Sequence, residues 1–155
     1  MNINPIVKFN IQNLGKNVKL PNSSRNYCTF DDKKLEKIAQ ERESALPHLD
    51  AFLKTNNNEK AVCEALYTID KMLDKKVKGV EKLYPTLSKF NKTKSPNIQV
   101  LLCGIYRKTL IPDAFGPMCA MLINQIQNPN SPYFDPTEEI GGAIFEYIRT
   151  NNKKD

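Results

Sequence analysis

The sequence of 155 residues contains no tryptophan, a single histidine and only six glycines. The histidine, His48, follows Pro47 in an expected helix and has no cysteine beside it. The sequence has no nucleophile elbow, no glycine loop that would cradle a phosphate and no metal-ligand cluster. We therefore expect a non-catalytic protein without a metal or a cofactor, with His48 on a helix surface.

The cysteines are few and do not form paired motifs. The four are Cys28, Cys63, Cys103 and Cys119. No two of them have the C-x-x-C spacing of a zinc site or a redox motif. Three of them fall in helical patterns, which indicates small buried side chains in a reducing compartment and favours a cytoplasmic protein. No apolar run approaches the roughly 20 residues of a membrane span, and the first residues lack a secretory core.

Charge is plentiful but unevenly distributed. The formal net charge is +6, and residues 1–30 carry four basic residues and no acidic one. Residues 59–95 hold nine lysines against five acids, whereas residues 129–155 hold five acids against three bases. This pattern is not the continuous basic stripe of a dedicated nucleic-acid binder.

One stretch of sequence recurs twice at a fixed interval. Residues 61–69, AVCEALYTI, are followed 39 residues later by residues 100–108 and after another 39 by residues 139–147. A small residue, a branched aliphatic and an aromatic coincide in the three copies, as Ala65/Gly104/Ala143, Leu66/Ile105/Ile144 and Tyr67/Tyr106/Phe145. Such a repeat predicts stacked units that bury their apolar faces against their neighbours.

The apolar spacing predicts an all-α protein with one helical repeat domain. Residues 1–30 are expected to be a disordered or extended basic tail, with a short strand at 6–11 or docking in a groove as alternatives. A helix is expected from Asp31 or Asp32 to near residue 43, before a first helix that begins at Ser44. The domain at 31–152 would contain three hairpins, whose second helices lie near 59–73, 96–111 and 136–150.

Prolines mark the first helix of each hairpin, at Pro47, Pro85 and Pro117. With the helix lengths and the 39-residue period, this arrangement over residues 44–150 resembles the HEAT repeat family. The resemblance implies a short α-solenoid of three hairpins whose second helices line a concave binding surface. The turns at 56–58 and 93–94 lack the aspartate that HEAT units usually carry, so the units are HEAT-like, and an irregular α-bundle is the alternative.

The repeated aromatic is the main candidate for binding. At about 100° per residue, the core side of the first copy consists of Val62, Ala65, Leu66 and Ile69, and Tyr67 points away from it, as does Glu64. Aromatic and arginine side chains anchor interfaces, so we expect an unidentified protein or peptide to bind at Tyr67, Lys71, Tyr106, Arg107, Phe145 and Arg149. The alternative is that these rings pack between adjacent hairpins. The middle copy is apolar nearly all round, which leaves open a covered central helix, a groove or a dimer face.

A basic run supplies the second hypothesis. The lysines between residues 71 and 94 could form a ridge that contacts phosphates, and its members include Lys71, Lys75, Lys76, Lys78, Lys82 and Lys89. Acids interrupt the ridge at Asp70, Asp74 and Glu81, and it contains no arginine for bidentate contacts. A nucleic-acid-associated protein that uses this ridge and the basic tail is therefore the alternative to a protein-binding scaffold.

Overall fold

The computed structural model describes residues 2–129 and 133–154, so residues 130–132 of the expected 31–152 domain lie outside the described part. The described residues are helical with no named strand, which confirms the all-α class. The helices are α1 (Pro5–Gln12), α2 (Asp32–Gln40), α3 (Leu46–Thr55), α4 (Glu59–Asp74), α5 (Tyr84–Leu87), α6 (Pro96–Thr109), α7 (Phe115–Gln127) and α8 (Thr137–Lys154). Short 3-10 turns are η1 (Arg42–Ala45), η2 (Val80–Leu83), η3 (Ser88–Phe90) and η4 (Pro112–Ala114). No helix of this part is long and apolar enough to cross a membrane.

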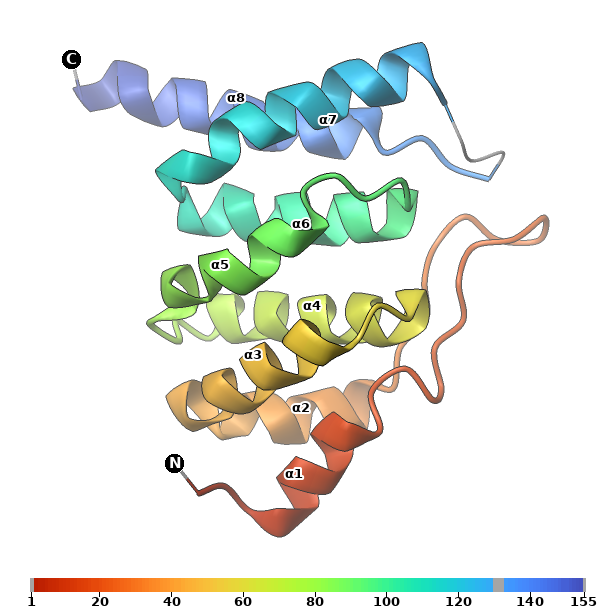
Figure 1. Cartoon of the computed structure of the whole chain (residues 1–155), viewed down its shortest axis with the longest axis vertical. Helices are drawn as coiled ribbons and strands as arrows, with labels where there is room; N and C mark the ends of the chain where they lie inside the picture. The colour runs from red at the N-terminus through yellow and green to blue at the C-terminus, as the bar shows by residue number, and fades with distance from the viewer. Residues whose placement is uncertain (1, 130–132, 155) are drawn as a thin grey trace.

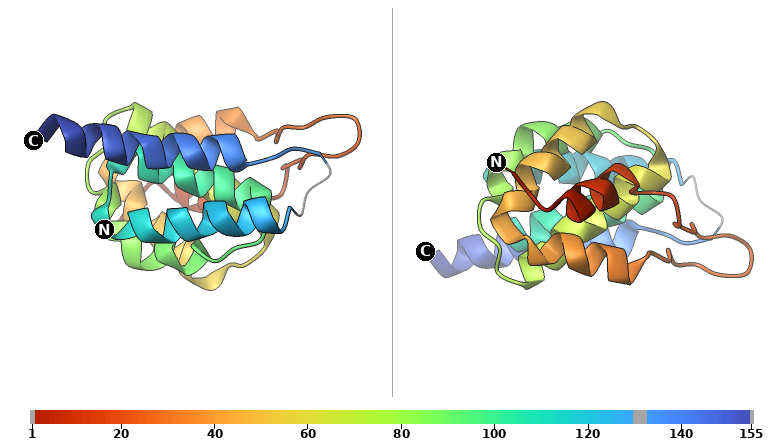
Figure 2. Two further views of the ribbon diagram at one scale, coloured as in Figure 1. Left: turned by 90° about the horizontal axis from the view of Figure 1, so that it is seen from above. Right: turned by 90° about the horizontal axis from the view of Figure 1, so that it is seen from below.

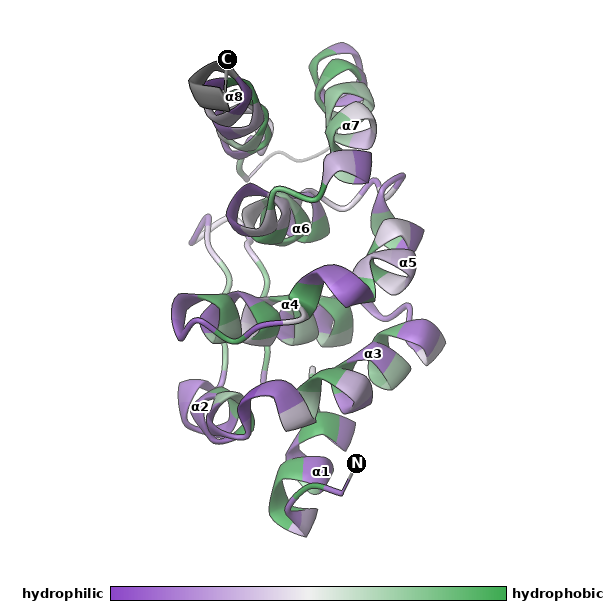
Figure 3. Ribbon diagram, turned by 90° about the vertical axis from the view of Figure 1, so that its left-hand side faces the viewer, coloured by the Kyte–Doolittle hydropathy of each residue, from purple (hydrophilic) through white to green (hydrophobic). Residues whose placement is uncertain are grey.

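The helices lie in two rows that run the length of the molecule (Figure 1). Helices α2, α4, α6 and α8 follow one another in one row, and each contacts the next. Helices α1, α3, α5 and α7 lie across them in the second row, as the side view in Figure 3 also shows. Successive helix pairs are thus stacked along one axis.

Local signals in the sequence explain where the long helices begin and end. The side chain of Asn58 accepts a hydrogen bond from the amide of Ala61 at the start of α4, and Ser95 caps α6 in the same way. Such caps satisfy amides that have no partner inside the helix. Helix α6 ends where Leu110 adopts a left-handed φ of 54°, two residues before Pro112.

The expected helix over 78–91 is shorter and more irregular than the spacing predicts. The segment forms η2, the single turn of α5 and η3 in succession, beginning after Gly79 at a φ of +98°. Pro85 lies near the start of α5, where its missing amide costs nothing, but its ring obstructs a continuous helix through residues 81–85. The second row, which contains α5, is consequently built on the whole from shorter helices than the row of α2, α4, α6 and α8.

The apolar side chains form one continuous core between the two rows. Val62, Ala65, Leu66 and Ile69 are completely buried, as the helical spacing of α4 predicts. Helix α4 is covered on nearly every side, because α2, α3 and α6 all contact it. Only a narrow strip of α4 remains accessible to a ligand.

The expectation of a disordered or extended tail over residues 1–30 is wrong for residues 5–12, whereas residues 17–31 form no helix. Residues 5–12 form α1, which Asn4 caps and Pro5 opens, so the alternative of a strand at 6–11 is also wrong. Val7, Ile11 and Leu14 are buried in the core against α2 and α3. Their spacing of four and three residues is helical and supplies an apolar face, which offsets the entropy of ordering this segment.

A long loop connects α1 to α2. Residues 17–31 run up and back as a narrow loop, held together by isolated bridges between Lys19 and Thr29 and between Asn22 and Arg25. The loop projects on the side where α4, α6 and α8 begin (Figure 2). It brings Cys28 to the start of α6, where the thiol contacts Asn97.

Candidate functional site

A cleft of about 490 Å³ lies between this loop and the row of second helices. One wall comes from the loop, another from α4 and the first turns of α6, and the third from the residues on either side of the α8 N-terminus. The lining residues are Pro21, Asn26, Tyr27, Cys28, Phe30, Tyr67, Asn97, Val100, Leu101, Phe134, Asp135 and Glu139. Four of the twelve are aromatic, which is typical of a surface that binds an apolar group.

Two of the aromatic rings in the cleft, Phe30 and Tyr67, stack on each other, and a third, Tyr27, is exposed. Phe30 of the loop stacks on Tyr67 of α4 with ring centroids 4.3 Å apart and planes 15° from parallel. Lys71 lies one turn further along α4, with its ammonium 5.4 Å from the centre of the Tyr67 ring. Tyr27 is 60% exposed, so most of its ring area is available for contact.

A polar wall faces these rings at the start of α6. The Cys28 thiol donates to Asn97 Oδ1 over 3.6 Å, and Asn97 Nδ2 donates to Glu59 Oε2 over 3.2 Å. Glu59 also accepts a hydrogen bond from the Ser95 hydroxyl. Burial, together with the Glu59 carboxylate, raises the pKa of Cys28 to about 11. The thiol is therefore protonated at neutral pH and is a poor nucleophile.

The charge at the edge of the cleft is negative. Asp135 and Glu139 are both exposed and line it, and no lysine or arginine is among the lining residues. Hydrogen bonds from the hydroxyl and amide of Thr137 hold the pKa of Asp135 below its usual range, so Asp135 is ionised at neutral pH. The cleft thus combines an apolar floor with carboxylates at one edge.

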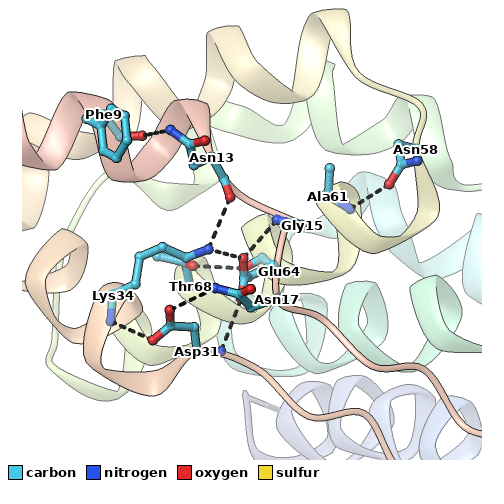
Figure 4. A network of polar contacts seen from close by, with 10 residues as sticks. All are labelled: Phe9, Asn13, Gly15, Asn17, Asp31, Lys34, Asn58, Ala61, Glu64 and Thr68. Carbon is cyan, nitrogen blue, oxygen red and sulfur yellow. Dashed lines mark hydrogen bonds and ion pairs between the residues drawn. The ribbon is translucent and has the colours of Figure 1, made fainter.

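The loop that forms one wall is anchored by a buried carboxylate, Glu64 of α4 (Figure 4). Glu64 accepts hydrogen bonds from the amides of Gly15, at 2.8 Å, and Asp31, at 3.2 Å. The ammonium of Lys34 lies 2.8 Å from the same carboxylate and also donates to the carbonyl of Asn13. Both ends of the loop are therefore fixed to one side chain, which determines where Tyr27, Cys28 and Phe30 lie.

The candidate binding residues from the sequence are separated in the structure. Tyr67 is half-buried and lines the cleft, whereas Lys71 lies over the Tyr67 ring and is not among the lining residues. Arg107, Phe145 and Arg149 are exposed but do not line the cleft. Arg149 pairs with Glu146 on its own helix. The six residues therefore do not form one surface.

Tyr106 contradicts the expectation of an exposed aromatic, since none of its surface is accessible. Its ring packs against Tyr84 of α5, and its hydroxyl donates to Asn91 Oδ1 over 2.6 Å. Gln99 and Cys103, which share that side of α6, are buried as well. For Tyr106 the alternative holds, in which the repeated ring packs between adjacent helix pairs.

The reason is a shift of two residues between the sequence repeat and the equivalent helix positions. The exposed strips of α4 and α6 correspond at an offset of 37 residues, where Lys60 matches Asn97, Tyr67 matches Gly104 and Lys71 matches Lys108. Two residues turn a helical position by about 200°. The offset of 39 therefore places Tyr106 on the side of α6 that faces the core.

Neighbouring groups engage three of the six lysines of the basic ridge. Lys75 lies 2.7 Å from Glu36, and Lys71 lies 3.9 Å from Asp32. Lys89 is directed at the end of α3, where its ammonium donates to the carbonyls of Leu53 and Lys54, as cations do at helix C-termini. Exposed lysines remain around the turn after α4, and they are Lys76, Lys78 and Lys82.

Sequence reasoning missed Glu64, which was expected on the outer face of α4. A signal was available, because Glu64 is the only charged residue between Ala61 and Tyr67. Its equivalent in the 39-residue register is Cys103, which is also fully buried. A charge within such an apolar run indicates a buried residue with a partner elsewhere in the chain.

Comparison with known proteins gives no significant match, whether to a protein-family model, a curated protein or a solved structure. In the part of the chain that the structure describes, no three His, Cys, Asp or Glu residues are grouped so that they could hold a metal ion. Function must therefore be argued from the cleft and its surroundings.

Proposed function

We propose that the chain is a short HEAT-like α-solenoid that acts as a non-catalytic scaffold and binds a peptide segment of a partner protein in the aromatic cleft. The observation that carries the proposal is the cleft itself, which lies on the row of α4, α6 and α8 and offers an exposed tyrosine beside uncovered carboxylates. The stacking of helix pairs in two rows supports the HEAT-like interpretation.

The chemistry of the cleft defines the peptide that fits. An exposed ring such as Tyr27 can bury about 150–250 Å² against a partner, which favours an apolar or aromatic anchor in the peptide. Asp135 and Glu139 favour a lysine or arginine beside that anchor. A peptide with one apolar residue next to one basic residue could contact both Tyr27 and the two carboxylates.

A role in catalysis finds little support in the same residues. The raised pKa of Cys28 keeps its thiol protonated at neutral pH, and the carboxylate of Glu59 disfavours the thiolate instead of stabilising it. A binding role requires only the shape and the charge of the cleft.

The nucleic-acid alternative is less well supported. Carboxylates line the cleft, and the lysines at 71, 75 and 89 are occupied by partners within the protein. Phosphate contacts would be left to the lysines of the turn after α4. Peptide binding therefore remains the function that we propose.

The experiment is a selection of random peptides on the intact protein, followed by affinity measurements on labelled binders by fluorescence anisotropy. Tyr27→Ala should weaken binding at least about tenfold, because truncating an interface anchor costs more than about 1.4 kcal/mol. The double substitution Asp135→Asn with Glu139→Gln should lower the affinity for basic peptides and make that affinity less dependent on salt concentration.

Phe145→Ala is the matched control, because Phe145 is as exposed as Tyr27 but lies outside the cleft. It should leave peptide affinity unchanged at concentrations where the protein is monomeric. If the selected peptides bind both the Tyr27 variant and the double variant as tightly as the unmodified protein, the cleft is not the peptide site.

A further inference from the structure

The helix pair that ends the stack exposes large apolar side chains. Helix α7 carries Ile123 and Ile126, and helix α8 carries Phe145 and Ile148, all with about half or more of their surface exposed. Residues three apart share one side of a helix. On α8 this side is turned away from the buried Ile140, and no further helix formed by the described residues lies beyond it (Figure 3).

The opposite end of the stack has the same character. Helix α1 exposes Ile6 and Phe9, again three residues apart, and Phe9 is 62% exposed. They lie on the side of α1 turned away from the buried Val7 and Ile11. Phe9 borders a groove between α1 and α2 whose basic residues are Lys16, Lys33, Lys34 and Lys37.

These two ends are unusual for a protein built of stacked helix pairs. In such proteins the terminal units normally carry a polar outer face, which keeps the stack from growing. Isolated exposed apolar residues need no explanation, but pairs of them at both ends of one stack indicate an interaction surface. Each internal pair is covered on both sides, whereas each end pair is covered on only one.

The two ends are also opposite in charge. Residues 1–40, which form the α1 and α2 end, contain seven basic and three acidic residues, a net charge of +4. Residues 115–155, which include the whole of the α7 and α8 end, contain five acidic and three basic residues, a net charge of −2. Like ends repel and unlike ends attract, so electrostatics favour contact between the two different ends.

We propose that the protein associates with a second copy of itself, head to tail. The α7 and α8 face of one copy docks on the α1 and α2 face of the next, so that Phe145 and Phe9 come from opposite sides of the interface. Because the two surfaces differ, the contact is heterologous, and it leaves one free end of each kind at the ends of the assembly. Addition of further copies continues the stack.

The proposal is tested by sedimentation velocity of the intact chain from about 1 μM to about 1 mM, the range in which weak interfaces associate. The average mass should rise with concentration and fall when salt is added, since screening weakens attraction between the oppositely charged ends. A monomer throughout this range would overturn the proposal.

Two single substitutions decide the geometry. Phe9→Asn blocks the head and Phe145→Asn blocks the tail, and either change alone should weaken association at least tenfold. An equimolar mixture of the two variants should recover a dimer with one copy of each, because one partner keeps an intact head and the other an intact tail. No species larger than this dimer should form.

A symmetric tail-to-tail contact gives a different result. In that case Phe9→Asn would associate like the unmodified protein, and mixing the variants would recover nothing, which would overturn the head-to-tail arrangement. Tyr27→Ala is the control for loss of an exposed aromatic away from both ends, and it should associate normally. Circular dichroism on each variant must show unchanged helix content, since all three rings are exposed.

Discussion

The backbone amide of Gly15 donates a hydrogen bond of 2.8 Å to the buried carboxylate of Glu64, where the N-terminal segment crosses the start of α4. The crossing is close: a Cβ atom on Gly15 would lie 2.7 Å from the Cα of Ala61. Gly15 also adopts a φ of +92°, which side chains disfavour. Conformation and space therefore both require glycine here.

Gly15→Ala should destabilise the protein. The positive φ alone costs about 1–3 kcal/mol for a residue other than glycine, and contact with the backbone of Ala61 adds to that cost. Urea unfolding measures the change. Gly116→Ala is the matched control, because a Cβ there meets no atom within 4 Å, and alanine in a helix is favoured by roughly 0.5–1 kcal/mol. Equal stability of the two variants would contradict the close crossing.

Glu64→Gln should lower the free energy of unfolding by about 3–5 kcal/mol, because it leaves the ammonium of Lys34 nearly buried without its counter-charge. Glu36→Gln removes the exposed pair with Lys75 and should have a much smaller effect. Because Glu64 holds both ends of the loop at 17–31, trypsin should also cut the Glu64 variant faster at Lys19 and Arg25. An unchanged cleavage rate would show that the loop is held by other contacts.

The helices of this protein follow from local signals that a sequence displays. Caps such as Asn58 and Ser95 set where α4 and α6 begin, and prolines mark the starts of the second-row helices α1, α3 and α5. The exposed face of each helix does not follow in the same way. A two-residue error in the repeat register turns the assigned face by about 200°, and this error placed Tyr106 on the surface.

The cleft could not be predicted from the sequence, because it depends on contacts between segments that are distant in the chain. Its loop wall is fixed by Glu64, whose partners at residues 15, 31 and 34 are distant in sequence. Sequence patterns reveal an amphipathic helix but not which distant backbone amides a buried carboxylate will meet. The position of Tyr67 and Lys71 on the outer strip of α4 follows from the period of that helix alone, and their role in binding stays a prediction.

Tyr106→Ala should cost about 3–5 kcal/mol of stability, as truncation of a buried aromatic does. Tyr106→Phe should cost about 1 kcal/mol, since it removes only the hydrogen bond to Asn91. Phe145→Ala is the exposed counterpart and should stay within roughly 0.5 kcal/mol. Thermal and urea unfolding at low protein concentration compare the three. A Tyr106→Ala variant as stable as the unmodified protein would contradict the burial of this ring.

The thiol of Cys28 offers a chemical probe of the cleft. Only the thiolate reacts with iodoacetamide, and the pKa of Cys28 is raised to about 11 by burial and by the carboxylate of Glu59. The labelling rate should therefore rise about tenfold per pH unit from neutral pH and continue to rise beyond pH 9, where an ordinary thiol with a pKa of about 8.5 levels off. Mass spectrometry of the digested protein follows Cys28 separately from the other three cysteines.

Two changes test the cause of the raised pKa and the place of the thiol. Glu59→Gln removes the negative charge that opposes the thiolate, so the pKa of Cys28 should fall and labelling at pH 8 should become faster. Burial is the larger cause, so the pKa should remain above that of an exposed thiol. A peptide bound in the cleft should slow labelling in proportion to its occupancy, because Cys28 lines the same cavity as Tyr27. A rate that levels off near pH 9 in the unmodified protein, or one that a saturating peptide leaves unchanged, would contradict the position assigned to Cys28.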